Sequence, residues 1–295
     1  MLASVMTFDE PMARYTTFGI GGPAACMVYP KNREELSTLL KYAHAQNIPA
    51  FFIGSGSNIL VWDDGFDGFV ISLRKTFKEL TISDDFQIIA ESGVMLGKLV
   101  KDAICANIQG LESLIGVPGT IGGTLIMNAG AYGSEISNYF QKATTMTLEG
   151  DLKTYTNDDI TFSYRHSTLP ENEILIEAVF NCIEGVPEKI QKERLIASQN
   201  RKTKQPLKFR SAGSVFKNPE GNHAAGYLID KTGLKGTQRG GAAISDKHAN
   251  FIVNAGEATA EDVFYLIKLA KQKVSKEFNI NLELEVKLVG FPESM

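Results

Sequence analysis

Two glycine-rich stretches carry residue types that can surround a phosphate group. The first is Gly54-Ser-Gly-Ser-Asn58, and the second runs from Gly116 to Gly133 as GVPGTIGGTLIMNAGAYG. Small residues let successive backbone N–H groups approach an anion, and the threonines and the asparagine of the second stretch add polar side chains. Two such loops suit a long ligand with a pyrophosphate in its middle. For the first stretch alone, an ordinary turn between two strands is an equally good interpretation.

Familiar nucleotide-binding motifs do not explain these glycines. The segment Gly93–Lys98 resembles a Walker A phosphate-binding loop, but it is one residue short. Leu99 follows it at the position where magnesium binding needs Ser or Thr. Ile59 stands where the dinucleotide-binding motif needs its third glycine. The zinc-protease and serine-hydrolase motifs are also absent from the sequence, and its four histidines are isolated.

Composition narrows the class of protein. With 295 residues, of which 43% are hydrophobic and 22% charged, the chain is expected to form about two globular domains. A net charge of −4 gives no general attraction for nucleic acid. The three cysteines contain no CxxC pair, so neither a disulfide framework nor a zinc site is indicated. No membrane-length apolar run and no secretion signal occurs, which predicts a soluble cytosolic protein without a metal.

Helices and strands alternate irregularly around these loops, which favours an α/β or α+β fold with a mixed sheet. Helices are predicted from apolar spacing at Lys31–Asn47, Met95–Ala106 and Pro187–Arg201, and a last one follows a variant capping box of Thr259 and Asp262. The predicted strands are Ala50–Ile53, Phe69–Leu73, Ile174–Cys182 and Leu282–Val289, with a hairpin over Thr144–Thr156. A basic loop, RKTKQPLKFR, is expected after the third helix.

Seven motifs follow one another from about Tyr15 to Gly290: YTTFGIGGPA, IGSGSNILVWDDGFDG, GVPGTIGGTLIMNAGAYG, FSYRHS, SAGSVFKNP, AAGYLIDKTGLKG and LELEV. In this set and order the chain resembles the UDP-N-acetylenolpyruvoylglucosamine reductase family. The resemblance implies a flavoenzyme of bacterial peptidoglycan synthesis. Such an enzyme uses NADPH and FAD to reduce the enolpyruvyl group of UDP-N-acetylglucosamine enolpyruvate to UDP-N-acetylmuramate.

The resemblance also implies an α+β fold with a two-lobed FAD-binding region of the vanillyl-alcohol oxidase-like (PCMH) type. We expect this region at residues 15–185, with lobes 15–75 and 76–185, then a connecting helix at 186–200 and a smaller α+β substrate-binding domain at 201–290. Neither glycine stretch contains His or Cys, so noncovalent FAD is expected. The expected FAD contacts are Gly54, Ser55, Gly56, Ser57, Asn58, Gly119, Thr120, Gly122, Gly123, Asn128 and Gly130.

Three residues match the catalytic motifs of the family: Arg165, Ser214 and Glu285. The resemblance implies that Arg165 and a protonated Glu285 stabilise negative charge on the substrate, and that Ser214 donates a proton. Without the resemblance, Arg165 reads as a surface ion-pairing residue and Ser214 as part of a turn. Glu285 would then belong to a solvated acidic strand edge together with Glu283.

Substrate contacts are expected at Lys204, Lys217 and Asn218, where basic and amide groups suit the diphosphate of a UDP-sugar. For the rest of the basic loop, a solvated linker is an equal alternative. Only Thr168–Glu173 separates the YRHS motif from the next strand, so the chain resembles the family class that lacks an extra tyrosine-bearing loop. Leu169 replaces an expected aromatic residue.

Two other functions remain open at this level. One is a flavin oxidase that passes electrons to oxygen, and the other is a flavin- or nucleotide-sugar-binding protein without turnover. The three catalytic motif residues favour the reductase over both. Its partner is expected to be the small-molecule substrate, with no nucleic acid or membrane, and the protein is expected to be a monomer or weak oligomer in the cytoplasm.

Overall fold

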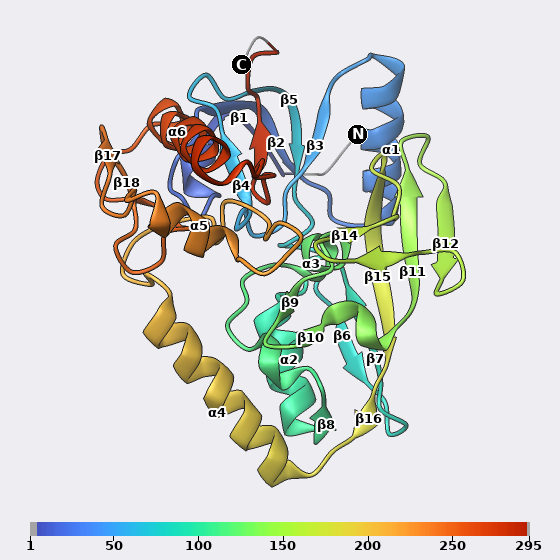
Figure 1. Cartoon of the computed structure of the whole chain (residues 1–295). Coiled ribbons are helices and arrows are strands. Elements are labelled where there is room, and N and C mark those ends of the chain that lie inside the picture. The colour runs from blue at the N-terminus through green and yellow to red at the C-terminus, as the bar shows by residue number, and fades with distance from the viewer. Residues whose placement is uncertain (1–4, 294–295) are drawn as a thin grey trace. The chain divides into compact units, whose positions relative to one another are not determined.

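The computed structural model describes residues 5–293, which fall into two compact units (Figure 1). Within these residues, unit 1 comprises 5–8, 26–55 and 68–201, and unit 2 comprises 9–25, 56–67 and 202–293. The chain therefore passes repeatedly from one unit to the other. Compact units need not coincide with ligand-binding regions, so the FAD region at 15–185 and the substrate region at 201–290 stay predictions.

Unit 1 contains a five-stranded antiparallel sheet with the strand order β12-β11-β15-β7-β6. These strands are β6 (Leu80–Ile82), β7 (Gln87–Glu91), β11 (Phe140–Thr147), β12 (Leu152–Thr156) and β15 (Glu173–Asn181). The predicted hairpin is confirmed as β11 and β12. Its turn contains Gly150 at φ +79°, a conformation that favours glycine.

Two helices of unit 1 bracket the glycine-rich second stretch: α2 (Leu96–Cys105) and the short α3 (Ile121–Ile126). Leu96, Leu99 and Val100 of α2 are buried in one core with residues of the sheet, which confirms the predicted helix. Gly122 and Gly123 lie inside α3.

A second sheet, most of whose residues belong to unit 1, has the order β1-β2-β5-β3 and packs with helix α1 (Arg33–Ala45). Its strands are β1 (Val5–Pro11), β2 (Pro23–Tyr29), β3 (Ala50–Phe52) and β5 (Phe66–Ile71). The Asn32 side chain caps α1 by accepting the Glu35 N–H over 2.9 Å. The predicted helix and the two predicted strands of this region are confirmed.

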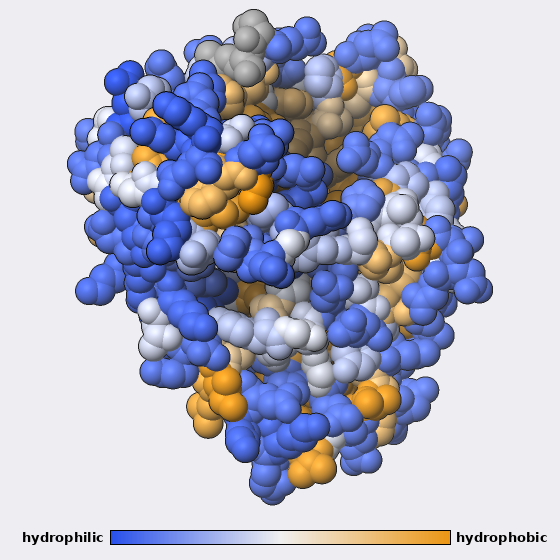
Figure 2. All heavy atoms as spheres, viewed as in Figure 1, coloured by the Kyte–Doolittle hydropathy of each residue, from blue (hydrophilic) through white to orange (hydrophobic). Residues whose placement is uncertain are grey.

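Helix α4 (Pro187–Lys204) extends three residues beyond its predicted end at Arg201. The start of the predicted basic loop is therefore helical. Only Ile190 and Ala197 of this helix are buried, and Leu195 and Ile196 are exposed. Figure 2 shows that the visible surface is mostly hydrophilic, with small separate apolar patches.

Short elements complete unit 1. They are the strands β8 (Ile108–Gln109), β9 (Gly130–Ala131), β10 (Ser134–Glu135), β13 (Phe162–Ser163), β14 (His166–Ser167) and β16 (Ile183–Glu184), and the 3₁₀ helices Glu112–Leu114 and Ile136–Tyr139.

Unit 2 is organised around helix α6 (Ala260–Phe278), which contacts α5, β17 and β18 (Figure 1). Its other elements are a 3₁₀ helix at Met12–Arg14, β4 (Ile59–Val61), α5 (Ala225–Lys231), β17 (Gln238–Arg239), β18 (Ala242–Ile244), β19 (Ile252–Asn254) and β20 (Lys287–Val289). The predicted capping box is confirmed, because the Thr259 hydroxyl accepts the Asp262 N–H and the Asp262 carboxylate accepts the Thr259 N–H.

The predicted terminal strand is wrong over Leu282–Val286. Leu284 forms one isolated antiparallel bridge with Phe216, whereas β20 pairs in parallel with β4. A chain that changes from an antiparallel to a parallel partner cannot remain one regular strand.

The structure combines helices with mainly antiparallel strands, which confirms the α+β class. Among residues 5–293, no helix is both long and apolar enough to cross a lipid bilayer.

Candidate active site

The two glycine-rich stretches approach each other at Gly54 and Thr120 in unit 1. A Cβ atom added to Gly54 would lie 2.3 Å from the Thr120 Oγ1 atom, so only glycine fits there without movement. Thr120 is itself held by a backbone bridge to Met95. The two loops are therefore in close contact at residues that lie far apart in the sequence.

Gly122 is also closely packed where α3 begins. The Gly122 N–H donates to the Ser92 carbonyl oxygen over 2.9 Å, and an added Cβ would lie 3.3 Å from the Ser92 Cβ. Gly119, at φ +154°, has no room for a side chain beside Thr124. Residues 119–122, at the start of α3, are thus packed closely against neighbouring residues.

Two buried polar atoms in this region have no protein partner among the described residues. They are the Ser92 Oγ and the Asn128 Oδ1 atoms, and Asn128 is fully buried. Unpaired buried polar atoms are rare in folded proteins, and a bound polar ligand or an ordered water satisfies them. Together with the closely packed glycines, these atoms fit a bound FAD, whose pyrophosphate and ring edges need such donors and acceptors.

Asn128 also organises the wall in which it lies. Its Nδ2 donates to the Glu135 carboxylate over 2.7 Å and to the Ser163 carbonyl oxygen over 3.0 Å. Its φ of +42° is left-handed, which asparagine tolerates better than most residues. Asn128 therefore fixes the end of α3 to the hairpin that carries Arg165.

Arg165 occupies the two-residue turn of the β13–β14 hairpin, in the left-handed region at φ +55°. Ser167 anchors this hairpin through a 2.8 Å hydrogen bond from its Oγ to the Ile126 carbonyl oxygen. A Cβ added to Gly130 would lie 3.5 Å from Arg165 Nη1. The structure thus brings the predicted catalytic arginine to the end of the glycine-rich stretch.

Ser214 and Glu285 are brought onto adjacent backbone segments in unit 2. The Glu285 N–H donates to the Val215 carbonyl oxygen over 2.8 Å, and the Lys217 N–H donates to the Glu283 carbonyl oxygen over 2.9 Å. Glu285 is half-buried, whereas Glu283 is exposed and faces Lys217 across 3.7 Å. The alternative of a shared solvated edge therefore describes Glu283 but not Glu285.

The first glycine-rich stretch continues into unit 2. An added Cβ on Gly56 would lie 2.0 Å from the Tyr15 carbonyl oxygen, and Gly56 has a φ of +63°. Asn58 donates from Nδ2 to the Glu285 carbonyl oxygen over 2.9 Å. Asn58, predicted as a cofactor contact, is thus also a backbone support for Glu285.

The three predicted substrate residues lie in different settings. Lys204 is the exposed last residue of α4. Lys217 lies beside Glu283, and the Asn218 Oδ1 accepts the Ala225 N–H over 3.0 Å at the start of α5. Arg165 belongs to unit 1, whereas Ser214, Lys217, Asn218 and Glu285 belong to unit 2.

Two residues, one in each unit, had no role in the sequence-based predictions. Arg201 lies against the glycine-rich stretch, where an added Gly116 Cβ would be 3.2 Å from its Cδ atom. Burial lowers the pKa of Arg201, and Tyr132 acts in the opposite direction. Asn250 is buried and bonds to the segment after Ser214. Its only sequence signal was an amide inside the apolar run Ala249–Val253.

Comparisons with known proteins match two families to two parts of the chain. Residues 24–156 match the family described as FAD binding domain. Residues 205–289 match the family described as UDP-N-acetylenolpyruvoylglucosamine reductase, C-terminal domain.

Similar proteins extend over nearly the whole chain. The UDP-N-acetylenolpyruvoylglucosamine reductase of Syntrophus aciditrophicus is 42% identical over 292 residues, covering 98% of this chain and 93% of that protein. The enzyme of the same name from Streptococcus uberis is 42% identical over 288 residues, covering 97% and 94%. The crystal structure of the Thermus caldophilus reductase matches with a TM-score of 0.81 and 35% identity, covering 98% of this chain and 100% of that one. The chain therefore belongs to the UDP-N-acetylenolpyruvoylglucosamine reductase family.

Proposed function

We propose that this protein reduces the enolpyruvyl group of UDP-N-acetylglucosamine enolpyruvate to UDP-N-acetylmuramate, with NADPH as reductant and FAD as cofactor, in peptidoglycan synthesis. The observation that carries this function is the 42% identity to reductases of that name over 98% of the chain. The balanced reaction consumes one NADPH and one proton for each enolpyruvyl group reduced. We also assign the protein to the class of this family that lacks the extra tyrosine-bearing loop.

FAD is assigned to residues of the two glycine-rich stretches. Gly54–Asn58 and Gly119–Gly123 would hold the pyrophosphate, and Asn128 and Gly130 would contact the rest of the cofactor. The contact between Gly54 and Thr120 and the unpaired Asn128 Oδ1 support this assignment. Bound there, FAD would supply the hydride transfer from NADPH to C3 of the enolpyruvyl group.

Hydride addition at C3 leaves negative charge at C2, which spreads into the substrate carboxylate as an enolate. Arg165 supplies a fixed cation with paired donors for that carboxylate. Glu285, in its protonated form, supplies a second donor, and the two together stabilise charge where it develops.

Ser214 then donates its hydroxyl proton to C2 and is reprotonated from solvent. Serine is a weak acid, but the carbanion is a strong base, so the transfer is favourable. The backbone pairing of 215–217 with 283–285 supports a shared role for Ser214 and Glu285, because it ties both residues to one local framework.

Lys204, Lys217 and Asn218 would bind the diphosphate of the UDP-sugar, within a substrate-binding region at 201–290. We further propose a cytoplasmic location and a monomeric or weakly oligomeric state. The unpaired cysteines Cys26, Cys105 and Cys182 support a reducing compartment.

An anaerobic experiment tests the function. The purified protein is loaded with FAD and reduced with NADPH, excess NADPH is removed, and the enolpyruvyl UDP-sugar is added. We expect the flavin absorbance to return as one equivalent of UDP-N-acetylmuramate forms. A flavin that stays reduced with the sugar, but is rapidly reoxidised by oxygen, would identify an oxidase instead.

A further inference from the structure

The segment Ser214–Lys217 lies between two other parts of unit 2. On one side it bonds to residues 283–286, since the Val215 carbonyl oxygen accepts N–H groups from Glu285 and Val286. The other side is occupied by Asn250. The position of Ser214 therefore depends on both neighbours.

Asn250 holds this segment through three hydrogen bonds. Its Oδ1 accepts the Phe216 N–H over 2.9 Å, and its Nδ2 donates to the Phe216 carbonyl oxygen over 2.8 Å. Its own carbonyl oxygen accepts the Val215 N–H over 2.8 Å. One amide side chain thus pairs with both polar groups of Phe216, as a neighbouring strand would.

Burial makes this arrangement hard to replace. Asn250 is 3% exposed and Phe216 is 2% exposed. Without the amide, both backbone groups of Phe216 would lack a partner in a place that water cannot readily enter, and the segment would shift to satisfy them. The effect would reach Ser214, which is two residues away from Phe216.

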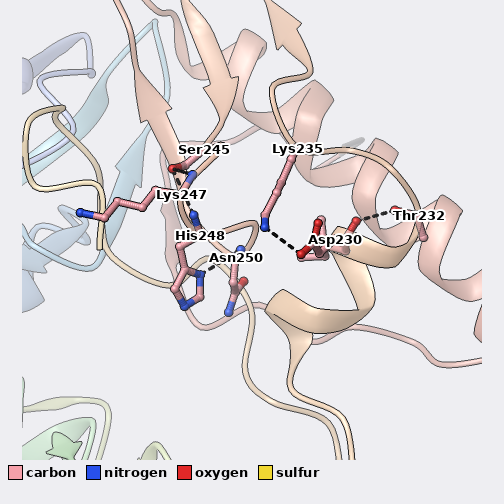
Figure 3. A network of polar contacts seen from close by, with 8 residues as sticks. Asp230, Thr232, Lys235, Ser245, Lys247, His248 and Asn250 are labelled. Atoms are coloured by element: carbon pink, nitrogen blue, oxygen red, sulfur yellow. Dashed lines mark hydrogen bonds and ion pairs between the residues drawn. The ribbon is translucent and has the colours of Figure 1, made fainter. Parts of the chain in front are cut away.

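A histidine turn holds Asn250 in place, as Figure 3 shows. The His248 Nδ1 accepts the Asn250 N–H over 3.3 Å, so this nitrogen carries no proton. Ser245 Oγ accepts the N–H groups of Lys247 and His248, over 3.2 and 3.4 Å. The His248 ring packs against Phe251 with centroids 4.8 Å apart.

We propose that Asn250 is a positioning residue for Ser214, which sets the serine hydroxyl for proton transfer to C2 of the substrate. This inference rests on the proposed function, because it needs Ser214 to be the proton donor. Asn250 touches neither cofactor nor substrate in this proposal. It acts only through the backbone of Val215 and Phe216.

The experiment measures the two half-reactions of the FAD-loaded enzyme separately. Asn250→Ala should slow flavin reoxidation by the enolpyruvyl UDP-sugar about 10²-fold, since misplacing a reacting group by 1 Å has that effect. Flavin reduction by NADPH should stay within about twofold, since misplacement of a proton donor leaves that step intact. Asn250→Asp keeps the acceptor for Phe216 N–H but loses the donor, and we expect a smaller loss in the same half-reaction.

Asn254 offers a matched control in the same unit. Its side chain also bonds backbone groups, donating to the Phe18 carbonyl oxygen and accepting from Gly256 and Ala258, and none of these bonds involves residues 214–217. Asn254→Ala should lower the melting temperature without selective loss of the substrate half-reaction. If Asn250→Ala fails to retain FAD, Asn250→Asp is used for the same comparison.

A double variant separates this inference from the proposed function. If Asn250 acts through Ser214, Asn250→Ala should add little to the effect of Ser214→Ala. If the rate losses of the two single variants multiply in the double variant, or if Asn250→Ala slows both half-reactions equally, Asn250 has a general structural role. Either result would overturn the positioning role of Asn250 but leave the proposed function standing. If Ser214→Ala leaves reoxidation unchanged, the assignment of Ser214 as proton donor fails, and the inference fails with it.

Discussion

The Asn58 side-chain amide donates a hydrogen bond to the Glu285 carbonyl oxygen over 2.9 Å. The Asn58 carbonyl oxygen also accepts the Lys287 N–H over 3.0 Å. A loop predicted to bind the cofactor is thus joined directly to the segment of a predicted catalytic carboxylate. Changes in either are expected to reach the other.

Asn58→Ala is therefore expected to weaken FAD binding and to slow the substrate half-reaction. The free energy of unfolding should fall by about 1 kcal/mol, the usual net value of one hydrogen bond. Fluorescence titration gives the FAD affinity, and rapid mixing gives the reoxidation rate. Asn58→Asp loses the donor to Glu285 without changing size. If Asn58→Asp altered FAD binding but not the reoxidation rate, the hydrogen bond to Glu285 would not contribute to the substrate half-reaction.

Ser214→Ala should separate the two half-reactions. General acid catalysis typically contributes at least about 10²-fold, so flavin reoxidation by the enolpyruvyl UDP-sugar should slow by about that factor. Reduction of the flavin by NADPH should remain nearly intact, and stopped-flow absorbance measures both rates. An equal loss in both steps would contradict the proton-donor role.

Lys204→Ala should raise the KM for the UDP-sugar while kcat changes little, because a diphosphate contact far from C2 contributes equally to substrate and transition state. Lys208→Ala is the matched variant, since Lys208 is another exposed lysine of unit 2. Steady-state kinetics at saturating NADPH measures both. An unchanged KM for Lys204→Ala would exclude the binding role.

Gly54→Ala should destabilise the fold and weaken FAD binding, because its Cβ would lie 2.3 Å from Thr120 Oγ1. Gly97→Ala is the control. Gly97 lies in α2 with no atom within 4 Å of an added Cβ, so this change should stabilise the protein by about 0.4–1 kcal/mol. Thermal unfolding with and without FAD tests both. Equal melting temperatures for the two variants would refute the steric argument.

Two buried glutamates should give opposite dependences of stability on pH. Burial raises the pKa of Glu112, and a hydrogen bond with Glu193 acts in the same direction. The unfolded chain releases this proton near pH 4.3, whereas the folded protein keeps it to higher pH. The stability contributed by Glu112 is therefore present at low pH and is lost as pH rises above about 4.3.

For Glu173, burial acts to raise the pKa, but hydrogen bonds from Lys153, Thr145 and Tyr155 lower it overall. Its stabilising contribution is present above about pH 4.3 and is lost as pH falls through the lower folded value. Melting temperatures of Glu112→Gln and Glu173→Gln across pH 3–7, measured against the parent protein, test this. We expect Glu112→Gln to gain relative stability towards pH 7, and Glu173→Gln to lose it.

Local patterns predicted much of the fold. The capping box of Thr259 and Asp262 and the apolar stripe that begins at Val263 involve residues within a few turns of one helix, so the sequence alone specifies them. The hairpin around Gly150 is equally local. The end of the chain was different, because the change of partner between Leu284 and Lys287 depends on residues more than 60 positions away.

The candidate site shows the same division. Motif residues such as Arg165 and Ser214 could be named from the sequence, and so could the two glycine-rich stretches. The supports could not be found in this way. Asn250 pairs with Phe216, which lies 34 positions earlier in the chain, and nothing near either residue indicates the contact.

The division of the chain has a consequence for its synthesis. Phe18, Ile20, Leu60 and Trp62 belong to a core whose other members all lie between Ala212 and Phe291. During translation these four residues are synthesised early, but they can be buried in this core only after the last third of the chain has been synthesised. Fragments that end near residue 200 would expose them. We therefore expect chaperone engagement and protease sensitivity of nascent chains to persist until α6 has emerged.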